Sequence, residues 1–322
     1  MIMKHLLAAA CVATVSITSV LAGGEGWTHD FSAAKKQAAT EEKDLLIDFT
    51  GSDWCGWCIR LNKEVFSHDP FKDGVKDKFV LVELDYPKDK SILSEETIKQ
   101  NEELQAKYSI KGFPTILLAD AEGRPFARTG YQEGGPEKYV AHLDELRAKK
   151  GQRDEAFAAA KNEEGVAKAK SLISALDTMD LEDEVVAEFY PEITDEIKAA
   201  DPKDETGFAA KIAAKQKFAE FEKELNGFGA KQDMEGALAF VEKSANSGEF
   251  EGEMKQQVLT IKASILARTG DFDAAIATIG EAQEAAPDSP AAAQLNGFKA
   301  QLESAKEKQA AAETKAEADD AE

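Results

Sequence analysis

The residues best suited to chemistry stand together in one short motif, which places two thiols beside aromatic side chains: Trp54, Cys55, Gly56, Trp57 and Cys58. The polar turn before the motif favours a helix that is capped by Ser52 or Asp53 and runs to about Phe66. Residues three positions apart lie on the same side of a helix, so the two thiols are expected to meet. Such a pair is typical of thiol-disulfide exchange.

The two cysteines are expected to differ in reactivity. Cys55 lies at the start of the helix, where unpaired backbone N–H groups and the helix dipole favour a thiolate. Cys58 shares an apolar stripe with Leu61 and Val65, so we expect it to be largely covered and Cys55 to be exposed. Cys55 would attack a partner's disulfide and Cys58 would resolve the mixed disulfide, or the reverse sequence would oxidise a reduced client.

Two other uses of the cysteine pair fit the sequence less well. A zinc site needs about four ligands, and the histidines that remain after export are not spaced as ligands: His29, His68 and His142. We therefore expect no metal and no cofactor. A permanent structural disulfide across so short a loop would restrict the unfolded chain very little.

The N-terminal residues predict export. Residues 1–22 combine a basic start, an apolar run and small residues, which is the pattern of a signal peptide cleaved after Ala22. Cleavage would remove Cys11 and leave the motif cysteines as the only thiols, in a periplasmic or secreted protein. Lipid attachment at Cys11 and a retained membrane helix are less favoured alternatives. No later stretch is apolar enough to suggest a membrane span after signal removal.

The net charge of −22 restricts the classes of partner. A strongly acidic surface repels nucleic-acid phosphates and anionic lipid headgroups, so no nucleic-acid partner is expected. The expected partners are client proteins with cysteines or disulfides, together with a redox partner protein.

The residues around the motif predict an α/β domain over 25–150, with the motif directly after its central strand. Strand 45–49 is nearly all apolar, as in a strand covered on both faces, and Asp48 is the exception within it. Further elements are expected as helices at 30–42, 95–108 and from 134, and as strands at 79–84, 115–118 and 124–129.

Three stretches together resemble the thioredoxin superfamily: residues 46–49, the motif at a helix start, and Gly112-Phe113-Pro114-Thr115 before a strand. The resemblance covers about residues 27–150 and implies a thioredoxin-like fold and a thiol-disulfide oxidoreductase. It also implies that Pro114 is a cis proline beside the cysteines and that Asp48 is the buried acid behind Cys58. Phe113 precedes Pro114, so its backbone is expected beside the client.

The flanking residues leave two questions open. Asp48 is either a proton acceptor for Cys58, with a pKa raised by burial, or a hydrogen-bonded strand acid. Trp54 and Trp57 are predicted to shape a hydrophobic lip for a client backbone. Trp57 stands where thioredoxins carry proline and disulfide isomerases carry histidine, so the direction of electron flow stays open, with reduction slightly favoured.

From about residue 151 the composition shifts to Ala, Glu and Lys, which predicts an all-α domain over 151–306. Segment 232–239 is echoed by segment 270–277, and a period of about 38 residues is typical of stacked helical hairpins. These residues resemble a tetratricopeptide repeat, so a tetratricopeptide-like domain is expected. Residues 307–322 have no apolar stripe and predict a disordered acidic tail.

Taken in order, the chain predicts an exported thiol-disulfide oxidoreductase whose helical half recruits clients or a redox partner, or acts as a spacer. The competing hypothesis is a helical-repeat binding or adaptor protein, whose thioredoxin-like domain is a redox-responsive or structural module.

Overall fold

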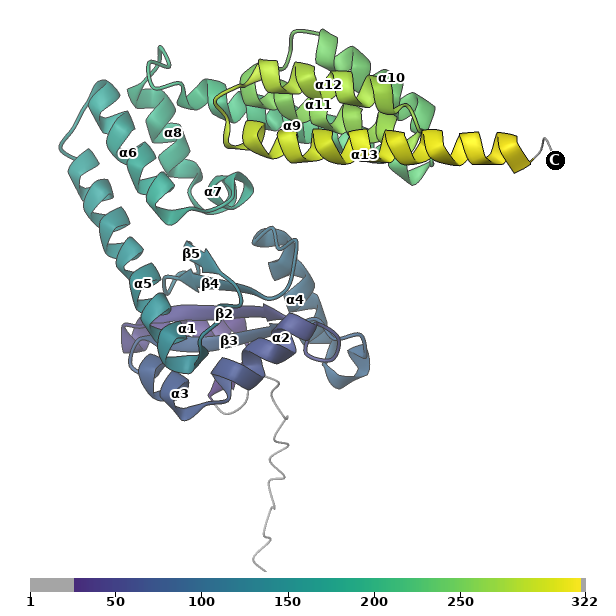
Figure 1. Cartoon of the computed structure of the whole chain (residues 1–322). Coiled ribbons are helices and arrows are strands. Elements are labelled where there is room, and N and C mark those ends of the chain that lie inside the picture. The colour runs from purple at the N-terminus through teal and green to yellow at the C-terminus, as the bar shows by residue number, and fades with distance from the viewer. Residues whose placement is uncertain (1–25, 320–322) are drawn as a thin grey trace, which may run out of the picture. The chain divides into compact units, whose positions relative to one another are not determined.

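The computed structural model describes residues 26–319. It divides into two compact units, Met1–Thr206 and Gly207–Glu322 (Figure 1). The predicted signal peptide at 1–22 lies outside the described residues. Among the helices of the described part, none is long and apolar enough to cross a membrane.

The first unit is built on a mixed sheet in the order β1-β3-β2-β4-β5. The central strand β2 pairs parallel with β3 and antiparallel with β4. Every residue of β2 and β3 is buried, as expected for strands covered on both faces. The bounds are β1 (Trp27–Thr28), β2 (Asp44–Thr50), β3 (Phe79–Asp85), β4 (Thr115–Ala119) and β5 (Pro125–Thr129).

Helices cover both faces of this sheet. Successive side chains of a strand point to opposite faces, and Phe49 packs against Tyr108 with ring centroids 5.6 Å apart. The face that carries Asp48 lies under a second aromatic cluster, in which Tyr139 packs on Phe66 at 5.8 Å. The elements are α1 (Phe31–Glu41), α2 (Gly56–Leu61), the π-helical η1 (Asn62–Phe66), α3 (Asp69–Val75), the 3-10 helix η2 (Lys90–Ile92), α4 (Glu95–Lys107) and α5 (Gly135–Ala160).

Helix α5 runs without interruption through residues 150 and 151, where the sequence predicts a domain boundary. Arg153 of α5 is buried and donates to the hydroxyl of Tyr190, which donates to the carbonyl of Pro125 in β5. These contacts tie the next helices to the sheet, and the structure divides at Thr206/Gly207 instead. The helices concerned are α6 (Gly165–Met179), α7 (Asp183–Phe189) and α8 (Pro191–Ala200).

The second unit is all helical, with a core that includes Val241, Val258 and Ile279. Asp233 and Asp271 cap α10 and α12 in the same way, each accepting a backbone N–H three residues further on. Helix α13 continues to Asp319, so the predicted disordered tail is helical through that residue, because Ala, Glu and Lys are strong helix formers. The bounds are α9 (Phe208–Ala230), α10 (Met234–Asn246), α11 (Gly252–Arg268), α12 (Phe272–Ala285) and α13 (Pro290–Asp319).

Candidate active site

Trp54 lies across the turn that leaves β2. Its indole Nε1 donates a 2.8 Å hydrogen bond to the backbone carbonyl of Tyr86, and its ring covers Gly51. A Cβ at position 51 would come within 2.6 Å of the indole. Glycine is therefore needed at this position for Trp54 to keep its place.

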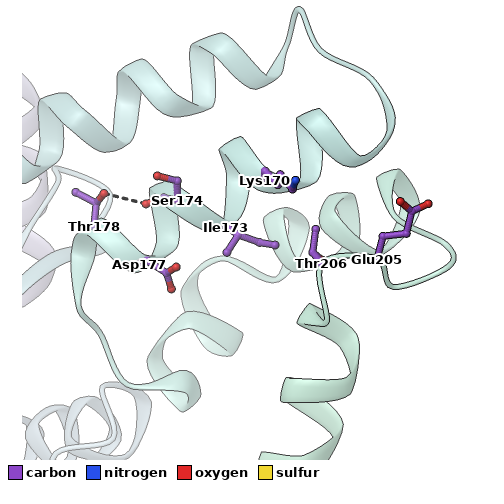
Figure 2. A pocket seen from close by; sticks show the side chains of 7 residues that line it. All are labelled: Lys170, Ile173, Ser174, Asp177, Thr178, Glu205 and Thr206. Atoms are coloured by element: carbon purple, nitrogen blue, oxygen red, sulfur yellow. Dashed lines mark hydrogen bonds between the residues drawn. The ribbon is translucent and has the colours of Figure 1, made fainter. Parts of the chain in front are cut away.

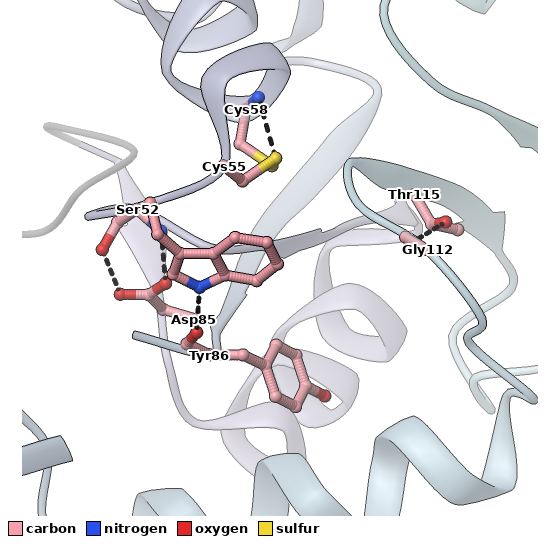
Figure 3. The surroundings of a disulfide bond; sticks show 8 residues. Ser52, Cys55, Cys58, Asp85, Tyr86, Gly112 and Thr115 are labelled. Carbon is pink, nitrogen blue, oxygen red and sulfur yellow. Dashed lines mark hydrogen bonds between the residues drawn. A yellow bond between two sulfur atoms is a disulfide. The ribbon is translucent and has the colours of Figure 1, made fainter. Parts of the chain in front are cut away.

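The predicted caps Ser52 and Asp53 do not cap the helix. The amide and hydroxyl of Ser52 donate to the carboxylate of Asp85 at 2.9 and 2.6 Å (Figure 3). Asp53 accepts hydrogen bonds from the amides of Lys88 and Asp89, which lower the pKa of its carboxyl. Both side chains therefore bind residues at the end of β3 and in the loop that follows it. They hold the turn before α2 in place rather than cap the helix.

Cys55 is the residue that caps α2. Its Sγ accepts a 3.2 Å hydrogen bond from the backbone N–H of Cys58, and the two residues form a disulfide with Cα atoms 5.2 Å apart (Figure 3). Cys58 is 4% exposed, as predicted, but Cys55 is only 6% exposed, so its predicted exposure is wrong. The disulfide and the cap bond turn its sulfur toward the helix rather than toward water.

The peptide bond between Phe113 and Pro114 is cis, as the resemblance implied. The ring of Phe113 lies 5.8 Å from that of Trp54 and 5.2 Å from that of Tyr86. A hydrogen bond within the loop stabilises it, because the hydroxyl of Thr115 donates to the carbonyl of Gly112 at 2.8 Å. Trp54 thereby bridges the cysteine helix and the proline loop.

Trp54 and Trp57 are 41% and 56% exposed, which excludes both from the core. The Trp57 ring packs on Tyr131 at 5.2 Å. The guanidinium of Arg60 lies over both rings, at 5.4 and 5.0 Å from their centroids, a distance suited to cation–π attraction. Glu64 accepts hydrogen bonds from Arg60 and from the Tyr131 hydroxyl. Polar groups that are held in place by hydrogen bonds therefore lie next to the apolar surface of Trp57.

Asp48 is 5% exposed and lies on β2 behind the disulfide. It lines a cavity of 360 Å³ together with Cys58, Lys63 and Glu83. Its Oδ1 has no hydrogen-bond partner among the described residues. Burial raises the pKa of Asp48 well above its usual range, and the charges of Glu83 and Asp85 raise it further. The raised pKa supports the proton-acceptor role of Asp48, which stays a prediction.

Glu83 and Asp85 of β3 were not predicted from the sequence as site residues. Both are buried, at 1% and 4% exposure, and stand in register with Asp48 and Thr50 of β2. Two acids that alternate with Leu84 inside an apolar strand were a detectable signal, because a charged side chain is rarely buried without a reason. Tyr131 and Arg60 gave no such signal, since their contact with Trp57 depends on the fold.

Two further features say less about the chemistry of the site. Gly56 begins α2, and a Cβ there would meet no other atom within 4 Å, so the structure does not require glycine. A hollow of 610 Å³ lies on α6 and the loop before α9 (Figure 2). Its lining includes Lys170, Asp177 and Glu205 but no thiol, so the redox chemistry belongs to the smaller cavity beside Cys58.

Comparison with known proteins agrees with this geometry. The family model of the thioredoxin-like domain matches residues 31–147. A Chlamydia pneumoniae protein, the disulfide bond reductase DsbH, is 36% identical over 115 residues, which are 36% of this chain and 69% of that protein. The chain belongs to the thioredoxin-like family. A thioredoxin-like domain with a disulfide between Cys55 and Cys58 is a thiol-disulfide oxidoreductase.

Further known proteins and solved structures are similar to part of the chain. The thioredoxin-related protein DsbJ of Chlamydia pneumoniae is 36% identical over 104 residues, covering 32% of this chain and 30% of that protein. A solved DsbH oxidoreductase is 29% identical, covering 44% of this chain and 92% of that one, with a TM-score of 0.36. The oxidised C-terminal domain of Neisseria meningitidis DsbD is 16% identical, covering 36% and 90%, with a TM-score of 0.26.

Proposed function

We propose that this protein reduces disulfide bonds in client proteins outside the cytoplasm, using Cys55 and Cys58 as its dithiol. The relative that shares the thioredoxin-like domain is a disulfide bond reductase by name, which supports the reducing direction. The signal-peptide pattern at residues 1–22 supports export to the periplasm or beyond.

Cys55 is proposed as the attacking thiolate. The single observation that carries this role is the 3.2 Å hydrogen bond from the Cys58 N–H to the Cys55 sulfur. In the reduced protein the same donor would stabilise negative charge on Cys55, since hydrogen bonds to the charged form lower a pKa. Cys58, covered behind it, would resolve the mixed disulfide.

The client is proposed to lie between the tryptophan lip and the proline loop. Trp54 and Trp57 offer exposed apolar surface beside the disulfide, and the loop with the cis Pro114, whose Phe113 packs on Trp54, would continue this surface. Asp48 would take the proton of Cys58 as that thiol attacks. Gly56 would serve only as the spacer between Cys55 and Trp57.

The helical remainder is proposed to recruit clients or a redox partner. The repeated aspartate caps of α10 and α12 support a tetratricopeptide-like arrangement in the second unit. We further propose that the first compact unit, which ends at Thr206, carries the catalytic fold and that the second unit, from Gly207, serves recognition.

The test is an assay in both directions followed by a redox titration. The purified protein should catalyse insulin reduction driven by dithiothreitol, and it should be poor at reoxidising reduced ribonuclease. The fluorescence of Trp54 and Trp57 should report a potential near that of thioredoxin, about −270 mV, rather than near −120 mV. Failure in both assays would refute the oxidoreductase role and favour an adaptor protein, whereas a potential near −120 mV would reverse the proposed direction.

A further inference from the structure

Two carboxyl groups face the same cavity beneath the disulfide. Asp48 of β2 and Glu83 of β3 are register partners in a parallel pair, so their side chains leave the sheet on the same face. Neighbouring strands lie about 4.8 Å apart. Both residues are at least 95% buried and line the 360 Å³ cavity that also contains Cys58.

Other charged and polar groups lie close to this pair. Asp85, the next acid on β3, accepts two hydrogen bonds from Ser52. Lys63 is the cation that lines the cavity, and Tyr139 of α5 also faces Asp48. The β4 partner of Asp48 is the apolar Ile116.

Among the described residues, His29 is a further titratable neighbour of Glu83. The Nδ1 of His29 lies 3.0 Å from the carbonyl of Glu83 and 3.8 Å from its carboxylate. Since a carbonyl only accepts, Nδ1 carries the hydrogen of that bond. The imidazole is 21% exposed and thus connects the buried pair with water.

Two adjacent carboxylates cannot both remain ionised at low cost in a buried site, so such a pair retains a proton. A lone aspartic acid titrates near 3.9, far below a thiol near 8.5, and would be a weak base for Cys58. Burial raises the pKa of Asp48, and the charge of the second carboxyl raises it further, so Asp48 becomes a stronger base.

We propose that Asp48 and Glu83 share one proton and act together as the proton acceptor and donor for Cys58. The inference rests on the proposed function, in which Cys58 resolves the mixed disulfide. Glu83 is a positioning residue here, since it acts through Asp48.

The step balances in the reducing direction. The Cys58 thiol gives its proton to the carboxyl pair, and its thiolate attacks the Cys55 sulfur of the mixed disulfide. The bond between Cys55 and the client sulfur breaks, and the client thiolate leaves with that electron pair. The pair then returns a proton, so the dithiol is oxidised and the client disulfide has become two thiols.

The direct test is a carbon-13 NMR titration of the side-chain carboxyl carbons of Asp48 and Glu83 in the whole protein. Both carbons should titrate in two steps at the same two pH values, because a coupled pair shares its macroscopic constants. In Asp48→Asn, Glu83 should titrate in a single step. Independent single steps in the wild type, with Glu83 near its ordinary value of about 4.3, would overturn the proposal.

A kinetic test measures how the same carboxyl pair affects the rate at which Cys58 reacts. The reduced protein is mixed with 5,5′-dithiobis(2-nitrobenzoate); Cys55 releases one thionitrobenzoate in the first phase and Cys58 releases another in the second. Glu83→Gln should slow the second phase about tenfold at neutral pH and move the onset of its rise to lower pH. The exposed Glu103→Gln of α4 should match the wild type.

A second phase in Glu83→Gln that superimposes on the wild type at every pH would refute the role of Glu83. The proposed function fails separately, through loss of insulin reduction with both phases intact.

Discussion

At the scale of single residues, a buried carboxyl beside a disulfide affects stability as well as reactivity. Asp48 is buried with an Oδ1 that has no hydrogen-bond partner among the described residues, and its pKa is raised, burial being the largest cause. The unfolded chain would ionise it near pH 3.9. Between that pH and the raised folded value, the folded state holds a proton that the unfolded state has lost, so stability falls as pH rises.

Asp48→Asn should therefore raise the free energy of unfolding at neutral pH, because asparagine has no ionisation for the folded state to suppress. The gain should vanish below about pH 3.9, where both states of the wild type are protonated. Urea denaturation from pH 3 to pH 8 measures it. An equal gain at every pH would mean that the effect comes from packing and not from ionisation.

The unequal cysteines lead to a second prediction. Cys58→Ser should accumulate mixed disulfides with client proteins in cells, because the attacking thiol remains and the resolving thiol is gone. Cys55→Ser is the matched control and should capture far fewer clients, since it lacks the thiol whose thiolate the Cys58 N–H would stabilise. Non-reducing electrophoresis followed by mass spectrometry measures the difference, and equal capture by the two variants would contradict the assigned order of attack.

At the scale of elements, several helices begin at a side chain that accepts a backbone N–H group. Asp233 and Asp271 supply this cap for α10 and α12 at equivalent positions of the echoed segments. In α2 the same position is taken by Cys55, while Ser52 binds Asp85. The repeated helices are thus capped for stability, whereas the cysteine helix places its sulfur at the cap.

Asp271→Ala should lower the free energy of unfolding of the second unit by about 1 kcal/mol, the usual cost of losing an aspartate cap. Asp233→Ala should cost a similar amount, because its bond to the Gly236 amide is equivalent. Glu281→Ala, in the exposed middle of α12, is the control and should change little. Thermal unfolding followed by circular dichroism checks this, and a cap variant as stable as the control would show that the caps are dispensable.

At the scale of the whole molecule, the fold that carries the cysteines extends beyond the part matched by the thioredoxin-like family. Arg153 and Tyr190 join α5 and α8 to β5, and Phe189 of α7 stacks on Tyr108 at 4.6 Å. Cutting the chain at residue 150 would divide α5 and expose these surfaces to water. The first compact unit ends at Thr206.

A fragment of residues 26–206 should therefore fold cooperatively and keep the redox potential of the whole protein. A fragment of residues 26–150 should be less stable by several kcal/mol, since exposing even one aromatic side chain costs about 1.5–3 kcal/mol. Guanidinium denaturation of the two fragments measures the difference. Equal stability would return the boundary to residue 150.

The features that depend on residues adjacent in the chain could be predicted from the sequence. The spacing of Cys55 and Cys58, the apolar run into them and the Gly-Phe-Pro-Thr stretch are contiguous patterns, and the strands, the disulfide and the cis Pro114 follow them. The other features of the site depend on the tertiary structure. Strand register placed Glu83 beside Asp48, and the closing loops brought Ser52 to Asp85, because such contacts join residues far apart in the chain. The burial of Cys55 was also not predicted, because it depends on the disulfide and the cap bond, which turn its sulfur toward the helix.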